Sequence, residues 1–315
     1  MNRRSFLATL SASLASAANR LPANKNIKWS LSLGLWNHFR PTAFTDILDV
    51  MKDTGFIGMR FTGYPGGLKA YNMTAGQIEK ECAKRGVTVM TISFGGPAHD
   101  PAQQQKMVAN AREAMNFLKT FGADRLVVFS PGRVAAGGDV KGAFKTMCDT
   151  FNKIGETAGE MGFRAGLHNH LDQMVEKPEE VHQCMAMTDP KLFDFYPDTA
   201  HLHLGGSDVV EMFKRYKTRL RMMDYKDAKW TTPAADITLD NGRTLAKDSK
   251  GAKFFSSIYD LGDGEIDFPS CHRVLKEVNY KGWICVDLDT ARKGPRASYE
   301  RSGAYIVNKL EPIYA

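Results

Sequence analysis

The sequence has few cysteines, and they do not form a recognisable cysteine site. Five cysteines are spread over 315 residues, their number is odd and no two of them make a C-x-x-C pair. Small secreted domains that depend on disulfides carry a denser and even-numbered set. The pattern argues against a disulfide scaffold and predicts buried or half-buried thiols.

Dense basic runs and long apolar runs are also missing after the first 20 residues. Lys and Arg outnumber Asp and Glu by 42 to 35, but they are scattered along the chain. Nucleic-acid-binding proteins usually gather such residues on one face or tail, so we expect no nucleic-acid partner. No later segment approaches the roughly 18 apolar residues of a membrane span, which predicts a soluble mature protein with no membrane contact.

The N-terminus, in contrast, has the pattern of an export signal. The segment MNRRSFLATLSASLASAANR begins with basic residues, continues with a short apolar stretch and offers an A-x-A cleavage site at residues 15–17. We therefore predict a signal peptide over residues 1–18 and a periplasmic protein. Residues 3–7, RRSFL, match the twin-arginine export pattern, and an ordinary export signal that contains two arginines is the alternative.

Short apolar runs alternate with helical patterns over the remaining chain. The runs are mostly continuous in apolar character, which is typical of parallel strands buried on both faces. We predict strands at 29–36, 57–63, 87–94, 125–130, 164–169, 192–198, 220–227 and 283–289. We predict helices at 44–54, 74–85, 101–121, 140–161, 178–187, 207–216 and 269–278. Three of these helices end at a glycine followed by a strand, at Gly86, Gly122 and Gly162, as expected for left-handed C-caps.

Eight strands that alternate with helices predict an α/β fold, a single-domain (β/α)₈ TIM barrel over residues 27–315. A doubly wound open sheet is the alternative, although no G-x-G-x-x-G follows the first strand, which weakens its dinucleotide-binding version. The polar segment 229–256 interrupts the pattern after the seventh strand. On a barrel it would lie at the catalytic rim, as a lid or substrate loop or as a passive surface insertion.

Histidines and carboxylates gather at the predicted strand ends, where barrel enzymes place their active-site residues. Five of the eight histidines lie there, together with several aspartates and one lysine. The set contains His38, Arg60, His168, His170, Asp198, His201, His203, Asp224, Lys226, Asp287 and Asp289. Imidazole and several carboxylates from different strands can surround a divalent cation, and an oxygen-rich set favours Mn²⁺ or Mg²⁺. A polar carbohydrate pocket without a metal is the alternative.

Five motifs in one order resemble the xylose isomerase-like TIM-barrel superfamily, in its sugar phosphate isomerase/epimerase branch. The motifs are GLHNH (166–170), YPDTAHLHLGGSD (196–208), MMDYKDA (222–228), LGDGEIDFP (261–269) and YKGWICVDLD (280–289). The resemblance covers about residues 28–312. It implies a barrel that acts on a small carbohydrate substrate, whereas members of the family isomerise, epimerise, dehydrate or cleave sugars, and some act on abasic DNA.

Carried over position by position, the resemblance implies a metal held by His168, Asp198, Asp224 and Asp287. It gives His201 and Lys226 to the substrate, and Asp287 or His170 would be the catalytic base. Three of these positions depart from the family pattern: His168 stands where the epimerases usually have Glu, Asp224 replaces a His, and Asp287 replaces a Glu.

These departures weaken a two-carboxylate epimerase and favour a metal site with a histidine base. We therefore expect a sugar isomerase, epimerase, dehydratase or lyase that removes a proton next to a carbonyl. Trp36, His38, Arg60, Tyr64 and His203 are further candidates for substrate contact, although Trp36 and Tyr64 would suit core packing equally. The main alternative is a periplasmic sugar-binding barrel that has lost the metal and its activity. An abasic-site endonuclease would need three clustered metals and more His and Glu than the strand ends supply.

Overall fold

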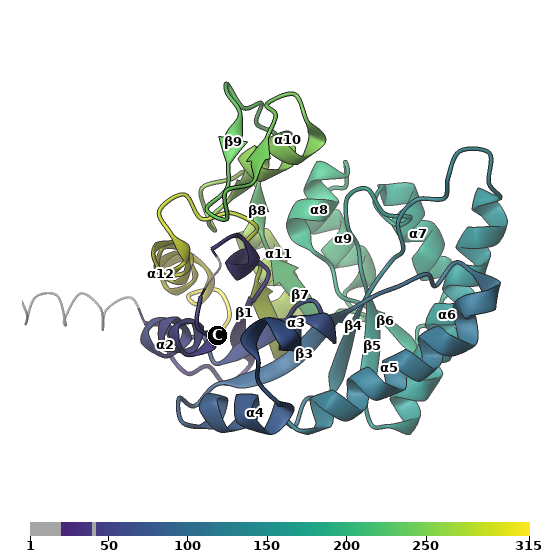
Figure 1. The fold of residues 1–315 in the computed structure, drawn as a ribbon, viewed down its shortest axis with the longest axis horizontal. Coiled ribbons are helices and arrows are strands. Elements are labelled where there is room, and N and C mark those ends of the chain that lie inside the picture. Colours follow the sequence, from purple (N-terminus) through teal and green to yellow (C-terminus); the bar gives the residue numbers. More distant parts are fainter. Residues whose placement is uncertain (1–19, 40–41) are drawn as a thin grey trace, which may run out of the picture.

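Eight parallel strands form the centre of the protein, and helices surround them (Figure 1). The computed structural model describes residues 20–39 and 42–315, so the predicted signal peptide lies outside the described residues. The strands are β1 (Ile27–Ser32), β2 (Gly58–Phe61), β3 (Thr88–Phe94), β4 (Arg125–Phe129), β5 (Arg164–His168), β6 (Phe193–Phe195), β7 (Met222–Tyr225) and β12 (Gly282–Val286). They pair in the order β6-β5-β4-β3-β2-β1-β12-β7. The predicted TIM barrel is confirmed, with each predicted strand in its place.

The barrel closes along a weak seam between β6 and β7. The two strands share only isolated parallel bridges, Phe195 with Leu220 and Asp198 with Asp224. The backbone N–H of Asp224 donates to the Pro197 carbonyl across this seam at 2.8 Å. The last bridge places two aspartates side by side at the carboxyl end of the barrel.

Seven of the helices that cover the sheet begin and end within a few residues of their predicted positions. The main helices are α2 (Phe44–Thr54), α3 (Gly66–Tyr71), α4 (Ala75–Ala83), α5 (Gln104–Lys119), α6 (Val140–Glu160), α7 (Pro178–Met187), α8 (Thr199–Leu204), α9 (Val209–Tyr216), α11 (Phe268–Glu277) and α12 (Pro295–Tyr305). Gly86, Gly122 and Gly162 have φ values of 67°, 66° and 76°, so the predicted left-handed C-caps are confirmed. The short helices α3 and α8 and the C-terminal α12 were not predicted.

The barrel interior is built in layers, because alternate residues of each strand point inward. One layer is an apolar cluster made of Met90, Val127, Tyr196, Met222 and Cys285. Asp224 and Lys226 lie two and four residues beyond Met222 of β7. Asp287 and Asp289 lie two and four residues beyond Cys285 of β12. Inward-pointing positions therefore alternate every second residue, and they carry apolar side chains in the core and polar side chains at the mouth of the barrel.

Segment 229–256 forms most of a small unit above the barrel rim. The unit comprises β8 (Asp227–Ala228), the hairpin β9 (Ile237–Thr238) and β10 (Thr244–Leu245), α10 (Lys250–Ser257) and β11 (Ile258–Tyr259). In Figure 1, β9 and α10 stand at the top of the view, clear of the barrel. The strand β11 returns antiparallel to β8, which ties the unit to the end of the seventh barrel strand.

A glycine-rich loop after this unit is fixed by one buried carboxylate. Asp227 Oδ2 accepts the backbone N–H groups of Gly262 and Gly264, at 2.8 and 3.0 Å. A Cβ on Gly264 would lie 2.3 Å from Asp227 Oδ1, so only glycine allows this approach. The motifs MMDYKDA and LGDGEIDFP are therefore two halves of one contact.

All five cysteines are free and buried, as the sequence predicts. Within residues 20–39 and 42–315, the helices fall short of the length and apolar character needed to cross a membrane.

Candidate metal centre

Three buried side chains meet at the seam of the barrel and could hold a metal ion. His168 is the last residue of β5, Asp198 follows β6 and Asp224 lies in β7. One ligand atom from each lies within 4.8 Å of the others, and all three residues are at most 1% exposed. The bridge between Asp198 and Asp224 explains why the two carboxylates are neighbours.

Asp198 is held in place from both sides. Its backbone N–H donates to Asn169 Oδ1 at 3.0 Å, and Asn169 Nδ2 donates to the Asp198 carbonyl at 3.3 Å. Asp198 is also the N-cap of α8, where Oδ1 accepts the backbone N–H of His201 at 3.1 Å. This cap uses one carboxylate oxygen and leaves Oδ2 directed at the candidate centre.

The donor set fits a divalent cation. Three of its buried atoms have no hydrogen-bond partner, Nδ1 and Nε2 of His168 and Oδ1 of Asp224. Oδ2 of Asp198 and Oδ2 of Asp224 are held only by ion pairs, with Lys226 at 3.1 Å and with Arg60 at 3.0 Å. Buried polar atoms are almost always paired in proteins, so a group this large indicates a ligand. One imidazole and two carboxylates are suitable ligands for Mn²⁺, Zn²⁺ or related ions.

The charges at the centre agree with this conclusion. A network of ion pairs joins four carboxylates to two cations: Asp198, Asp224, Asp287 and Asp289 with Arg60 and Lys226. When all four carboxylates are ionised, as metal binding requires, four negative and two positive charges leave a net charge of −2. One divalent cation would neutralise it, which matters because an uncompensated buried charge is costly.

Burial also shifts the pKa values of the candidate ligands. Burial raises the pKa of Asp198 to about 6 and that of Asp224 to about 8, against the opposing effects of Lys226 and Arg60. Burial and the nearby cations lower the pKa of His168 well below its usual value. The imidazole is therefore neutral at pH 7, the form in which it binds metals.

Asp287, expected from the resemblance to be a fourth ligand, has other partners. Its Oδ2 lies 2.8 Å from Arg60 Nη2 and 2.7 Å from Lys226 Nζ. Burial alone would raise its pKa, but the two cations outweigh burial and hold the pKa well below the usual range. The group of three potential ligands does not include Asp287, whose carboxylate instead contacts both cations.

Arg60 and Lys226 are buried and lie against the carboxylates of the centre as counter-ions. Arg60 is 3% exposed and also lies 3.0 Å from Asp224. Lys226 Nζ contacts Asp198, Asp287 and Asp289 at 3.1, 2.7 and 2.7 Å. An ammonium group has three N–H donors, so these carboxylates can use all of them.

His170 lies next to the candidate ligands with its ring partly open. Its ring centroid is 3.7 Å from that of His201 and 6.4 Å from that of His168. Phe129 contacts both His168 and His170, with centroids 4.1 and 5.9 Å away. The two histidines of GLHNH therefore face the same region, as their spacing of two predicts.

His201 and His203 lie on opposite sides of α8, although the sequence suggested a strand end for both. Two residues on a helix are about 200° apart, whereas on a strand they share a side. His201 is fully buried at the centre, 3.4 Å from Lys226. His203 instead lies 2.8 Å from Glu265 and does not reach the centre.

Two aromatic candidates are likewise placed away from the centre. Trp36 is 3% exposed and stacks on Tyr299 at 5.3 Å, inside the core. Tyr64 packs on Phe117 of α5 with ring centroids 5.0 Å apart.

Three contributors to the centre were missed at the sequence level. Asn169 lies in the middle of the HNH stretch and positions Asp198 through its side chain. Thr199 Oγ1 lies 2.9 Å from the Lys226 backbone N–H and 2.8 Å from its carbonyl, which fixes the lysine. Phe254 of α10 stacks flat on His201, at 5.4 Å and 5°. Asn169 and Thr199 are sequence neighbours of candidate residues, so the sequence could have indicated them. The contact of Phe254 depends on how the insertion folds back onto the barrel.

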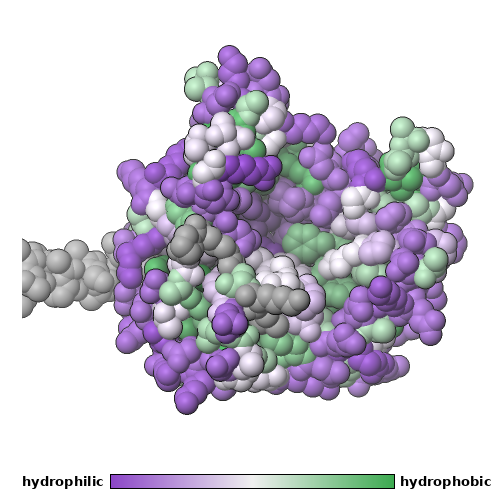
Figure 2. All heavy atoms as spheres, in the orientation of Figure 1, coloured by the Kyte–Doolittle hydropathy of each residue, from purple (hydrophilic) through white to green (hydrophobic). Residues whose placement is uncertain are grey.

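A cavity of about 480 Å³ lies beside the candidate ligands. Its lining includes Phe94, His99, Phe129, Ser130 and Gln173, from the carboxyl ends of β3 and β4 and the loop after β5. Phe129 separates it from His168. Figure 2 shows a hollow in the molecule below the projecting insertion, with hydrophilic side chains around it and hydrophobic ones deeper inside. The volume is within the usual range for small-ligand sites, about 300–1,000 Å³.

The barrel with polar residues at its carboxyl end is the architecture of a known class of TIM-barrel proteins. A family model confirms that the chain is a member of this class. The xylose isomerase-like TIM barrel model matches residues 48–308. The chain belongs to this family, and its similar proteins include sugar isomerases, epimerases and dehydratases.

Individual relatives show the same relationship. The chain is 29% identical over 197 residues to the inosose dehydratase of Bacillus velezensis, which covers 59% of this chain and 63% of that protein. A sugar phosphate isomerase/epimerase from Parabacteroides distasonis superposes with a TM-score of 0.68, at 18% identity over 93% and 96% of the two chains.

Two further solved structures share the fold. The IOLI protein with a bound zinc atom has a TM-score of 0.70, at 13% identity over 91% of this chain and 99% of that one. The 3-keto-D-glucoside 4-epimerase YcjR from E. coli has a TM-score of 0.66, at 16% identity over 89% and 99%.

Proposed function

We propose that this protein is a metal-dependent enzyme that removes a proton next to the carbonyl of an oxidised sugar or cyclitol and expels a hydroxyl group. In this assignment it is a dehydratase or lyase rather than a two-base epimerase. The observation that carries the proposal is the buried His168, Asp198 and Asp224 group beside a neutral histidine. The inosose dehydratase relative supports the reaction class, and the sugar epimerase neighbours support the substrate class.

His170 is the proposed general base. Its Nδ1 lies 2.8 Å from the Leu171 carbonyl, which can only accept, so Nδ1 carries the proton. The lone pair is therefore on Nε2. Burial lowers the pKa of His170 below its usual value, so the ring is neutral at pH 7 and ready to accept a proton.

Asp287 is poorly suited to be a second base. Arg60 and Lys226 both contact its carboxylate and hold its pKa well below the usual range. A carboxylate so strongly stabilised in its charged form is a weak proton acceptor. Epimerisation needs an acid or base on each face of the carbon, whereas elimination needs one base and a departing group.

The proposed reaction is an elimination of water from the substrate. His170 Nε2 takes the proton from the carbon beside the carbonyl, the C–O bond on the next carbon breaks and a C=C bond forms. The imidazolium returns its proton to the departing oxygen, so water leaves. A divalent cation bound by His168, Asp198 and Asp224 would supply Lewis-acid polarisation of the carbonyl. Phe254 stacks on the buried ring of His201 beside this region.

The metal, the substrate and the location belong to the proposal as well. Mn²⁺ is our first choice for the metal, since two carboxylates and one imidazole suit it, and Mg²⁺ and Zn²⁺ are the alternatives. The substrate is a small carbohydrate, and the location is the periplasm, reached through the predicted twin-arginine signal.

The proposal is tested by incubating the Mn²⁺-loaded protein in D₂O with an inosose and with 3-keto sugars, followed by NMR and mass spectrometry. We expect loss of one water from a substrate, dependent on metal and slowed about 10²–10⁴-fold in His170→Ala. A panel of keto sugars that shows neither water loss nor exchange of the proton beside the carbonyl would contradict it.

A sugar-binding barrel without catalysis is the second candidate. It is favoured by the ion pairs of Asp287 with Arg60 and Lys226, which leave three candidate ligands where the resemblance implies four. Metal analysis after purification without chelators separates the two candidates. A divalent metal content near one equivalent supports the enzyme, and protein that neither contains nor binds Mn²⁺ supports the binding protein.

A further inference from the structure

A second cavity, of about 520 Å³, lies under the insertion and shares a wall with the metal centre. Residues of the insertion form one side, including Leu239 and Phe255, and the loop after β12 forms the other, including Asp289 and Arg292. The shared wall is Asp289, which lines the cavity and receives the Lys226 ammonium at 2.7 Å.

The insertion divides its aromatic side chains between the two sites. Phe254 stacks on His201 at the metal centre, whereas the adjacent Phe255 meets the edge of His38 in the cavity, with centroids 5.0 Å apart. One helix, α10, therefore covers both sites at once. A ligand that filled both would contact neighbouring residues of the same helical turn.

The lining of the cavity suits a sugar ring. Phe39, Leu239 and Phe255 offer apolar faces, and Asp289 and Asp240 offer acceptors for hydroxyl groups. Sugar rings have one apolar C–H face and a rim of hydroxyls, so they need both kinds of contact.

One polar atom at the cavity also lacks a protein partner. His38 Nδ1 is buried and has no hydrogen-bond partner among the residues that the structure describes. A buried, unpaired ring nitrogen at the edge of a cavity indicates a group that the ligand supplies. The Asp289 side chain remains 26% exposed, so it can also receive a ligand hydroxyl.

We infer that this cavity binds a second sugar ring, so that the natural substrate is a glycoside rather than a free monosaccharide. The oxidised ring would lie at the metal centre, and the linked ring would pass Asp289 and pack between Phe255 and the loop after β12. This inference rests on the proposed function for the carbohydrate nature of the substrate. Beyond the proposed function, it states that the substrate has two sugar rings and that the insertion binds the second one.

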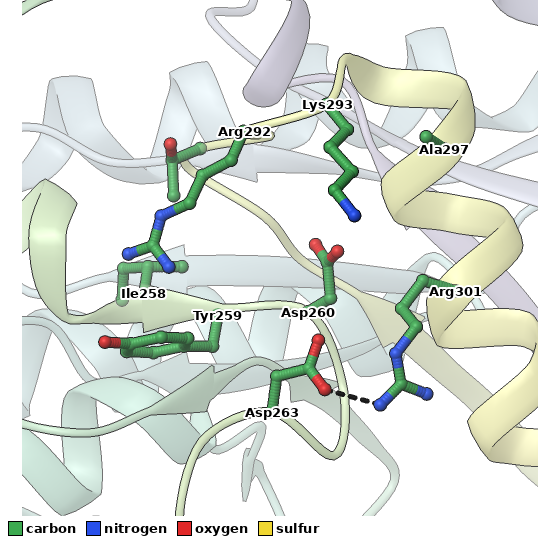
Figure 3. A pocket seen from close by; sticks show the side chains of 9 residues that line it. Ile258, Tyr259, Asp260, Asp263, Arg292, Lys293, Ala297 and Arg301 are labelled. Atoms are coloured by element: carbon green, nitrogen blue, oxygen red, sulfur yellow. Dashed lines mark hydrogen bonds and ion pairs between the residues drawn. The ribbon is translucent and has the colours of Figure 1, made fainter.

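A neighbouring cavity on the other side of Thr290 and Arg292 does not compete for this role. Its lining includes Tyr259 and four charged residues, Asp260, Asp263, Lys293 and Arg301, and Figure 3 shows the two carboxylates facing the lysine and the arginine. Arg301 pairs with Asp263, and Arg292 lies over the Tyr259 ring at 4.5 Å. Arg292 and Arg301 thus have partners within the protein, and none of the lining residues is a candidate metal ligand.

Calorimetry with 3-ketoglucose and 3-ketocellobiose tests the inference on the full chain loaded with Mn²⁺. We expect the disaccharide to bind at least about tenfold more tightly, because it fills both sites. Phe255→Ala should reduce that preference to below about threefold and leave the monosaccharide affinity unchanged. Ser256→Phe, which narrows the cavity, should do the same without removing a packed side chain. Trp230→Ala, an exposed aromatic of the insertion, is the matched control and should keep the preference.

Equal affinities in the wild type, no detectable binding of the disaccharide, or an equal loss for both sugars in Phe255→Ala would overturn the inference. Made in the His170→Ala background, which keeps the metal but slows the proposed reaction about 10²–10⁴-fold, the measurement reports binding rather than turnover. Failure of the proposed reaction with an intact disaccharide preference would leave the cavity assignment standing. If the protein catalyses the proposed reaction but binds both sugars equally, the assignment of the cavity is wrong and the proposed reaction stands.

Discussion

Replacing Arg60 by methionine removes one of the two buried cations of the metal centre while keeping much of the side-chain volume. Its guanidinium lies 3.0 Å from Asp224 and 2.8 Å from Asp287, with 3% of its surface exposed. Breaking a buried ion pair by removing one partner typically costs about 3–5 kcal/mol, because the remaining charge is left without compensation. We expect a loss of that order in the unfolding free energy of the metal-free protein.

The same change should strengthen metal binding. With all four carboxylates ionised, the net charge of the centre is −2 with Arg60 and −3 without it, and in the variant a cation no longer lies against the ligand Asp224. A bound divalent ion then recovers part of the lost stability. If it recovers about 1.4 kcal/mol, the affinity for Mn²⁺ rises about tenfold.

Denaturant unfolding with EDTA and with Mn²⁺, together with calorimetry, measures both effects. Arg219→Met is the matched control, since Arg219 is also buried but bonds the carbonyls of Met185 and Phe193, away from the candidate ligands. It should lose stability without a gain in Mn²⁺ affinity. An Arg60→Met affinity that is unchanged or weaker than that of the control would refute the reasoning. If the variant does not fold, Arg60→Lys should keep both stability and affinity near the wild type.

Three other predictions concern the metal ligands, the base and a remote histidine. His168→Ala should lose Mn²⁺ binding, which calorimetry measures. His170→Ala should keep Mn²⁺ binding while kcat falls about 10²–10⁴-fold, which kinetics measures. Full activity in either variant would contradict the role proposed for that histidine. Mn²⁺ at about 100 times its dissociation constant should stabilise the wild type by about 2.7 kcal/mol, seen as a Tm several degrees above that in EDTA, with no such shift in His168→Ala. His272 is buried against Trp29 and Tyr225, and burial lowers its pKa from 6.5 to about 4. The unfolded chain takes up the proton first, so stability is full above pH 6.5 and falls by about 3 kcal/mol toward pH 4. His272→Phe should flatten that part of the stability curve, and an unchanged slope would show that other groups cause it.

Much of the barrel was predictable because its signals are local. Continuous apolar runs identified the strands, and C-cap glycines such as Gly86 marked helix ends. Polar residues at strand ends pointed to the mouth of the barrel, which is where His168, Asp198 and Asp224 meet. Each of these inferences needs only neighbouring residues and the rule that parallel strands end at one edge.

The helix α8 shows where local reading failed. The segment after Asp198 continues an apolar strand and lacks a strong helix pattern, so both His201 and His203 looked like strand-end residues. The carboxylate of Asp198 caps a short helix instead, and helical geometry turns His203 away toward Glu265.

By itself, the sequence determined the barrel, the order of its strands and the carboxyl-end position of its histidines and aspartates, because period and chain order dictate them. Only the tertiary structure decided which charges meet. Arg60 comes from β2 and Lys226 follows β7, far apart in the chain, and their positions beside Asp287 depend on barrel closure and strand register. Partner choice among several like-charged side chains is a matter of a few ångströms, and spacing along a sequence does not carry that information.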